Sequence, residues 1–190
     1  LTEQLEENTK YNGQDYQGIN TEDIYTNEET ERSYDNIEII LNLDNSNSME
    51  GEIIEKTKKE AQKLVESLME KMPGIKIGVV NFNTKANTVL MPSGDKNKVL
   101  KAIEEILSEG DTGIARGIEE AIGDYSKTID KKIMILFTDG QENVENNEEV
   151  IRTIEKTADK ENIELISVLT KEQNQIFGTS EKPRRGVVYN

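Results

Sequence analysis

Short apolar runs that alternate with amphipathic stretches constrain the fold of this chain more than any other feature of its sequence. Each run has five to eight residues, as expected of strands that are buried on both faces. Between the runs, apolar residues recur at three- and four-residue steps, which is typical of helices with one buried face. This alternation predicts an α/β fold with a doubly wound, mostly parallel central sheet and helices on both faces, a Rossmann-like arrangement. The predicted strands cover residues 37–43, 75–82, 133–137 and 163–169.

The stretches between these strands predict the helices. In the stretch that follows the second strand, the periodicity places Leu107 on the inward face of its helix. Another helix is expected to start after Thr112, whose side chain occupies a helix N-cap position. The helix that contains Leu107 covers residues 96–108. Two more expected helices cover residues 51–72 and 147–160, and a weaker strand covers residues 88–91.

The composition divides the chain into one domain and two extensions. Residues 1–33 hold nine acidic and two basic side chains and sustain no regular period, so we assign them to an acidic N-terminal extension. Residues 34–170 carry the alternating strands and helices and form the predicted domain. Residues 171–190 lose the periodicity and form a C-terminal extension. Within it, residues 186–189 are either a short edge strand or part of a tail, and their apolar character favours the strand.

The composition also excludes several classes of site. The chain has no cysteine and no histidine, which rules out disulfides, thiolate nucleophiles, Ser-His-Asp triads and histidine-ligated zinc. Its 38 acidic and 23 basic residues give a net charge of −15, which disfavours nucleic-acid binding through a basic patch. No apolar run approaches the roughly 20 residues of a membrane-spanning helix. Any metal site must therefore be built from oxygen ligands, which suit Mg²⁺, Mn²⁺ or Ca²⁺.

Polar side chains follow the predicted strands at the place where open parallel sheets bind ligands, beyond their carboxyl ends. Asp44, Ser46 and Ser48 follow the first strand, and alternate residues of this loop can turn toward one point. Asp139 ends the most apolar strand, and Thr112 lies in a loop before a helix. Two carboxylates brought together repel each other unless a cation lies between them. We therefore predict a metal site made by these five residues, with room for water or for an oxygen of a partner.

Three short motifs, in this order along the chain, resemble those of the von Willebrand factor A domain family. Residues 44–49, Asp-Asn-Ser-Asn-Ser-Met, resemble the Asp-x-Ser-x-Ser motif that opens the family's metal-ion-dependent adhesion site (MIDAS). Residues 110–114, Gly-Asp-Thr-Gly-Ile, resemble the family's Gly-Gly-Thr-Asn-Ile loop, with Thr112 at the ligand threonine. Residues 136–140, Leu-Phe-Thr-Asp-Gly, match the family's strand that ends in Thr-Asp-Gly, with Asp139 at the second acidic position.

The resemblance covers residues 35–170 and departs from the family pattern at two places. Asn47 stands where the family usually has a glycine, often with a positive φ, and asparagine tolerates that region better than most residues. Asp111 and Gly113 replace the usual glycine and asparagine on either side of Thr112, and Asp111 adds negative charge. Neither departure removes a predicted ligand.

The resemblance implies a domain that binds a protein partner through a divalent cation, as in cell adhesion, and that is not an enzyme. Magnesium, or else Mn²⁺ or Ca²⁺, would be held by Ser46, Ser48 and Thr112, with Asp44 and Asp139 as direct or water-mediated ligands. An Asp or Glu side chain of the partner protein would complete the shell. Nucleic acid is not expected as a partner, and neither is direct insertion of this segment into a membrane.

Three alternatives stay open. Members of the family inside cells serve as scaffolds of ATPase or chelatase-like complexes. A metal-dependent hydrolase could use Asp44 and Asp139, but a phosphatase of the haloacid dehalogenase kind would need an aspartate in place of Ser46. No glycine-rich motif for phosphate or dinucleotide binding occurs in the sequence. The third alternative is a scaffold whose metal site is vestigial.

We expect a bacterial protein that is secreted or exposed at the cell surface, with a cytoplasmic location as the alternative. Bacterial domains of this family are often surface-exposed or membrane-anchored, and abundant Asn, Lys, Glu and Ile are typical of AT-rich bacterial genomes. The chain begins with Leu1 rather than Met, so we expect a signal or anchor segment upstream of it.

Overall fold

The computed structural model describes residues 33–140 and 142–169, together with four short strands within residues 173–189. Apart from Ser33, the predicted N-terminal extension therefore lies outside the described residues.

The helices and strands follow the alternation seen in the sequence. Helix α3 begins after Gly51 and ends before Pro73-Gly74, and both glycines have a positive φ. The main strands are β1 (Ile37–Asp44), β2 (Lys76–Phe82), β3 (Ala86–Ser93), β4 (Lys131–Thr138) and β5 (Ile163–Leu169). The helices are η1 (Asn47–Met49, one 3-10 turn), α3 (Glu52–Lys71), α4 (Lys96–Glu104), α5 (Ile114–Asp124) and α6 (Asn147–Lys160). The short strands are β6 (Gln173–Asn174), β7 (Gly178–Thr179), β8 (Lys182–Pro183) and β9 (Val187–Tyr189).

The central sheet has six strands in the order β3-β2-β1-β4-β5-β9. Only β3 is antiparallel to its neighbour, and the other five strands run in one direction. Strand β1 lies between β2 and β4, with Leu41 opposite both Val79 and Ile135. The carboxyl ends of β1, β2, β4 and β5 consequently meet at one edge of the sheet. Strands β6, β7 and β8 form a separate small antiparallel sheet.

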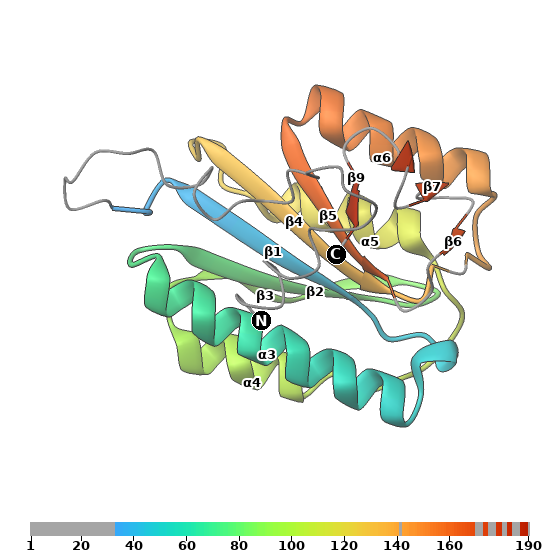
Figure 1. The fold of residues 1–190 in the computed structure, drawn as a ribbon, viewed down its shortest axis with the longest axis horizontal. Coiled ribbons are helices and arrows are strands. Elements are labelled where there is room, and N and C mark those ends of the chain that lie inside the picture. The colour runs from blue at the N-terminus through green and yellow to red at the C-terminus, as the bar shows by residue number, and fades with distance from the viewer. Residues whose placement is uncertain are drawn as a thin grey trace, which may run out of the picture.

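Two hydrophobic clusters, one on each face of the sheet, form the core. Alternate residues of β1 serve the two faces, with Ile39 and Leu41 on one face and Ile40 on the other. Helices α3 and α4 cover the first face through Ala61, Val65, Val99 and Ile103, and α5 and α6 cover the second through Ile114, Ile118, Val150 and Ile154 (Figure 1). The predicted doubly wound, mostly parallel α/β fold is confirmed.

Helix α4 is shorter than its periodicity predicts. It ends at Glu104, and residues 106–109 form a loop, although Ile106 still packs into the core. The prediction that Leu107 points inward is wrong, because its side chain is 76% exposed. The helix ends early because the Leu107 carbonyl accepts a hydrogen bond from the side-chain amide of Asn45, in the loop after β1 (2.7 Å).

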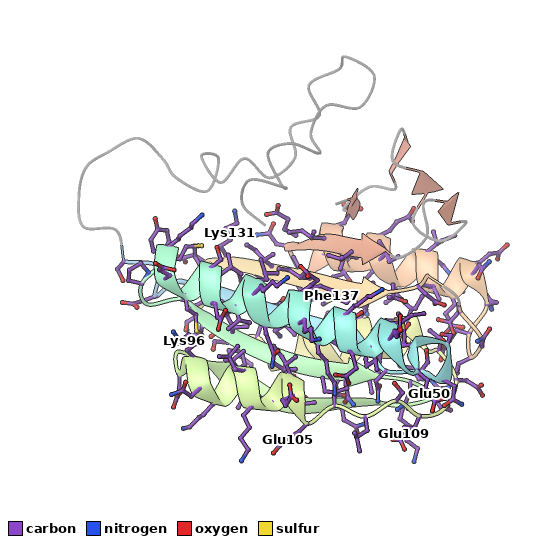
Figure 2. All side chains as sticks on the ribbon, turned by 60° about the horizontal axis from the view of Figure 1, so that its bottom comes forward. Glu50, Lys96, Glu105, Glu109, Lys131 and Phe137 are labelled. Carbon is purple, nitrogen blue, oxygen red and sulfur yellow. The ribbon has the colours of Figure 1, made fainter. Side chains whose placement is uncertain are left out.

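The two ends of the strands define two edges of the molecule. Figure 2 shows Glu50 and Glu109, from the loops that precede α3 and α5, at one end, and Lys96 and Lys131 at the other. The end with Glu50 and Glu109 is the one at which the parallel strands finish. No described helix is both long and apolar enough to cross a bilayer.

Candidate metal site

The five residues predicted as metal ligands all lie at the carboxyl-end edge of the sheet. Asp44 is the last residue of β1, and Ser46 and Ser48 follow it within the turn that leads into α3. Thr112 lies between α4 and α5, and Asp139 directly follows β4. Four of the five residues are buried, and only Ser48 is partly exposed. The site is therefore open to solvent on the side of the Ser48 loop.

Hydrogen bonds join four of these residues into one cluster of oxygen atoms. The Ser46 hydroxyl donates to Asp44 Oδ1 (2.6 Å), and the Ser46 N–H donates to the same oxygen (3.0 Å). Ser46 Oγ also lies 3.0 Å from Ser48 Oγ and accepts from the Thr112 hydroxyl (2.9 Å). The structure thus brings together side chains that lie 66 positions apart in the sequence.

The Asp44 carboxylate is the electrostatic centre of this cluster. Burial raises its pKa from 3.8 to about 6, hydrogen bonds from Ser46 and Thr138 oppose the shift, and repulsion by Asp139 adds to it. The fifth predicted ligand is therefore close enough to act on the charge of the first. A cation would remove this repulsion and replace the water that burial takes from Asp44.

Thr138 also belongs to the site, although the sequence alone does not predict it as a site residue. Its hydroxyl donates to Asp44 Oδ2 (2.6 Å) and accepts from the Gly140 N–H (3.0 Å). Gly140 has a φ of 77°, a left-handed conformation that turns the chain just after Asp139. The register of β1 against β4 identifies Thr138 as a neighbour of Asp44. Leu43 lies opposite Phe137, and the next residue on each strand is Asp44 and Thr138, respectively.

Thr112 is not the N-cap that its position before α5 suggests. The N-cap is Gly113, which has no side chain to offer, and the first N–H of the helix, from Ile114, donates to Glu142 Oε2 instead (2.7 Å). The Thr112 hydroxyl is therefore available to the Asp44 cluster. Gly113 itself is tightly packed, since a Cβ there would lie 2.8 Å from the Asn83 carbonyl oxygen.

Backbone and amide hydrogen bonds hold the Asp44 loop against the Thr112 loop. Besides the bond from Asn45 to Leu107, the Asn47 N–H donates to the Gly110 carbonyl (2.9 Å) and the Glu109 N–H to the Asn45 carbonyl (2.8 Å). The Asn83 amide reaches Asn45 Oδ1 at 3.4 Å from the turn between β2 and β3. The loop geometry is thus set by residues that are not predicted ligands.

The two departures from the family pattern are accommodated without strain. Asn47 begins the turn η1 and needs no left-handed conformation, because Asn162 is the one described non-glycine residue with a positive φ. The exposed Asp111 donates its N–H to Thr84 Oγ1 (2.8 Å). The Asp111 side chain adds negative charge at the edge of the site and does not replace a predicted ligand.

The donor set fits a hard divalent cation. Two carboxylates and three hydroxyls are present, and all are oxygen donors of the kind that Mg²⁺, Mn²⁺ and Ca²⁺ prefer. Within the described part of the chain, no group of three or more acidic residues is arranged to hold a metal ion. An ion at this edge would therefore depend on the three hydroxyls to complete its shell.

The family is shown by a direct match. A model of the von Willebrand factor type A domain matches residues 39–141, which is more than half of the chain. The chain belongs to this family. The matched segment contains all five predicted ligands.

Known proteins similar to this member of the von Willebrand factor type A family are mostly longer. An uncharacterized protein from Synechocystis is 28% identical over 120 residues, which are 61% of this chain and 28% of that protein. An aerotolerance-related membrane protein from Bacteroides fragilis shares the fold with a TM-score of 0.61 and 24% identity, over 70% of this chain and 67% of that one. The minor pilin PilB from Streptococcus sanguinis does so with a TM-score of 0.63 and 12% identity, over 81% of this chain and 56% of that one. At these identities the two structures establish the fold alone.

Proposed function

We propose that this domain binds a protein partner through a divalent cation held at the carboxyl-end edge of the sheet. The observation that carries the proposal is the cluster formed by Asp44, Ser46, Ser48 and Thr112, with the Asp139 charge beside it. Three separate segments of the chain supply these oxygens. The cluster corresponds to the adhesion site that the sequence motifs resemble.

The spacing of the hydroxyls is compatible with magnesium or manganese. Adjacent ligands of an octahedral Mg²⁺ ion lie about 2.9 Å apart, because each Mg–O distance is about 2.0–2.1 Å. Ligands around the larger Ca²⁺ ion would lie farther apart, at roughly 3.4 Å. The separations of Ser46 Oγ from Ser48 Oγ and Thr112 Oγ1, 3.0 and 2.9 Å, are hydrogen-bond distances that an octahedral Mg²⁺ ion could take over with little movement of the hydroxyls.

The coordination number of the site, rather than its charge, leaves room for an oxygen ligand from the partner. Asp44 and Asp139 together neutralise one divalent cation, and three hydroxyls leave a coordination position for another oxygen. That position lies on the side of Ser48, the one predicted ligand that is partly exposed. A partner's Asp or Glu side chain supplies a strong oxygen ligand there.

Binding rather than catalysis is supported by the groups around the site. The chain has no histidine to act as a general base. The nearby carboxylate of Glu142 is already occupied, since its two oxygens accept three backbone N–H groups. The similarity to a minor pilin and to a bacterial membrane protein supports a role at a bacterial cell surface.

Water-proton relaxation with Mn²⁺ tests both parts of the proposal. Bound Mn²⁺ with an exchangeable water gives enhanced relaxation, and we expect this enhancement for the native chain and its loss in Ser48→Ala. Acetate should then lower the enhancement by displacing that water, whereas neutral acetamide should not. Absence of any bound Mn²⁺ at millimolar concentration would refute the metal site. Equal effects of acetate and acetamide would refute the acidic ligand.

A further inference from the structure

The loop after β4 contains a carboxylate with both oxygens engaged by backbone groups. Glu142 Oε1 accepts from the Val144 N–H (2.8 Å) and the Glu145 N–H (3.0 Å), within its own loop. Oε2 accepts from the Ile114 N–H (2.7 Å), the first residue of α5. Because Ile114 follows Thr112 by two residues, the Glu142 side chain joins the loop that starts at Asp139 to the loop that carries Thr112.

A second contact ties the same two loops together. The Asn143 N–H donates to the Thr112 carbonyl (3.0 Å), so the loop after β4 holds the Thr112 backbone while the Thr112 hydroxyl donates to Ser46. Next to this contact, Arg116 donates through Nε to Glu145 Oε1 (2.5 Å) and also donates to the Thr84 carbonyl. The position of Thr112 therefore depends on the conformation of residues 142–145.

We propose that Glu142 is a positioning residue of the metal site, which sets the separation of the Asp139 carboxylate and the Thr112 hydroxyl. It acts through the Ile114 N–H and through its own loop, and it does not contact the ion. This inference rests on the proposed function, because it presupposes an ion at the five predicted ligands. Partners that orient metal ligands in this way typically contribute about 10- to 100-fold to metal affinity.

Glu142→Gln tests the inference because three donors surround this carboxylate. A glutamine offers one oxygen and one NH₂ group, so the NH₂ group must face an N–H donor either at Ile114 or at Val144 and Glu145. One side of the connection is then lost, while the size of the side chain is kept. We expect the dissociation constant for Mn²⁺, measured by electron paramagnetic resonance, to rise by about 10-fold or more.

Glu145→Gln is the matched control. It removes the same charge from the same loop, but its remaining side-chain oxygen can still accept from Arg116 Nε. We expect its dissociation constant for Mn²⁺ to stay within about 3-fold of the native value, because the variant keeps the Glu145 N–H that donates to Glu142 and loses only one charge of an ion pair whose partner, Arg116, is half exposed. Equal losses in the two variants would show a charge effect and overturn the positioning role.

A double variant separates positioning from general destabilisation. If Glu142 acts by placing Thr112, adding Glu142→Gln to Thr112→Val should cost less affinity than it does in the native chain, whereas independent effects would multiply. Multiplying effects would overturn the inference. If Glu142→Gln does not fold, Glu142→Asp is the alternative, because it keeps the charge but withdraws the carboxylate. Native Mn²⁺ affinity in Glu142→Asp would also overturn the inference. Failure of the native chain itself to bind Mn²⁺ would instead refute the proposed function.

Discussion

Strand β1 carries a buried carboxylate at each edge of the sheet, and the two differ in their surroundings. Glu38 and Asp44 lie six residues apart on the same face of the strand, and both are almost completely buried. Glu38 accepts one hydrogen bond on each oxygen, from the Ser126 N–H (2.8 Å) and the Ser126 hydroxyl (2.6 Å). A single serine after α5 thus satisfies this carboxylate within the fold.

Asp44 lies instead among several hydroxyls and beside a second carboxylate. Its oxygens accept from Ser46 and Thr138, and the Ser46 hydroxyl continues the network to Ser48 and Thr112. The comparison teaches that burial alone does not mark a functional carboxylate. A buried carboxylate marks a cation site when further oxygen donors and a second negative charge converge on the same point.

The largest expected effect is on stability, from Glu38→Ala. Loss of two hydrogen bonds to a buried charge should lower the free energy of unfolding by about 3–5 kcal/mol. Because Glu38 lies far from the carboxyl-end edge, the loss should be equal in EDTA and in Mg²⁺. Urea unfolding under both conditions measures it, and a loss seen only with Mg²⁺ would break the distinction between the two carboxylates.

The second effect is a pH dependence of the metal-free protein. Because burial raises the pKa of Asp44 to about 6, protonation of this carboxyl favours the folded chain. Its contribution is fully present below pH 3.8 and is lost as the pH rises through about 6. In EDTA the difference in stability between Asp44→Asn and the native chain should therefore grow by roughly 2–2.5 kcal/mol between pH 4 and pH 7. A constant difference across this range would contradict the buried environment of Asp44.

The third effect concerns the hydroxyl of Thr112. Thr112→Val keeps the shape of the buried side chain and should weaken Mn²⁺ binding about 10-fold, or about 1.4 kcal/mol, with little change in stability in EDTA. Thr157→Val is the matched control, because Thr157 is equally buried but its hydroxyl donates to the Thr153 carbonyl within α6. Isothermal titration compares the two variants, and unfolding of Thr112→Val would show that the residue is structural.

The smallest effects are expected from substitutions at the two ends of α5, which runs between the two edges of the sheet. A Cβ at Gly123 meets nothing within 4 Å, so Gly123→Ala should stabilise the helix by about 0.5–1 kcal/mol. A Cβ at Gly113 would lie 2.8 Å from the Asn83 carbonyl oxygen, so Gly113→Ala should displace the Thr112 loop and weaken Mn²⁺ binding. Thermal unfolding and Mn²⁺ titration of both variants check this, and unchanged binding in Gly113→Ala would show that the loop tolerates displacement.

The sequence predicts the strands, the main helices and the sheet direction because these depend on local periodicity and burial. The end of α4 is mispredicted for the same reason: Ile106 continues the helical period, but Asn45, some 60 positions earlier, draws the Leu107 carbonyl into a loop. A tertiary hydrogen bond here overrides the local pattern.

The predicted ligands could be proposed from their positions at strand ends, but their supporting residues could not. Thr138 becomes recognisable only when the register of β1 and β4 is known. Glu142 replaces the expected cap of α5 from a different loop, and a local sequence rule assigns that role to Thr112 instead. Contacts between loops that are distant in the sequence leave no periodic signal.

Thermal unfolding with and without Mg²⁺ tests the central claim most directly. The free energy gained from an ion at 100 times its dissociation constant is about 2.7 kcal/mol, which corresponds to a rise in Tm of about 5–10 °C for a domain of this size. We predict this rise for the native chain, its retention in Thr157→Val and its loss in Asp44→Ala. An equal rise in the native chain and in Asp44→Ala, or no rise in either, would contradict a metal site at Asp44.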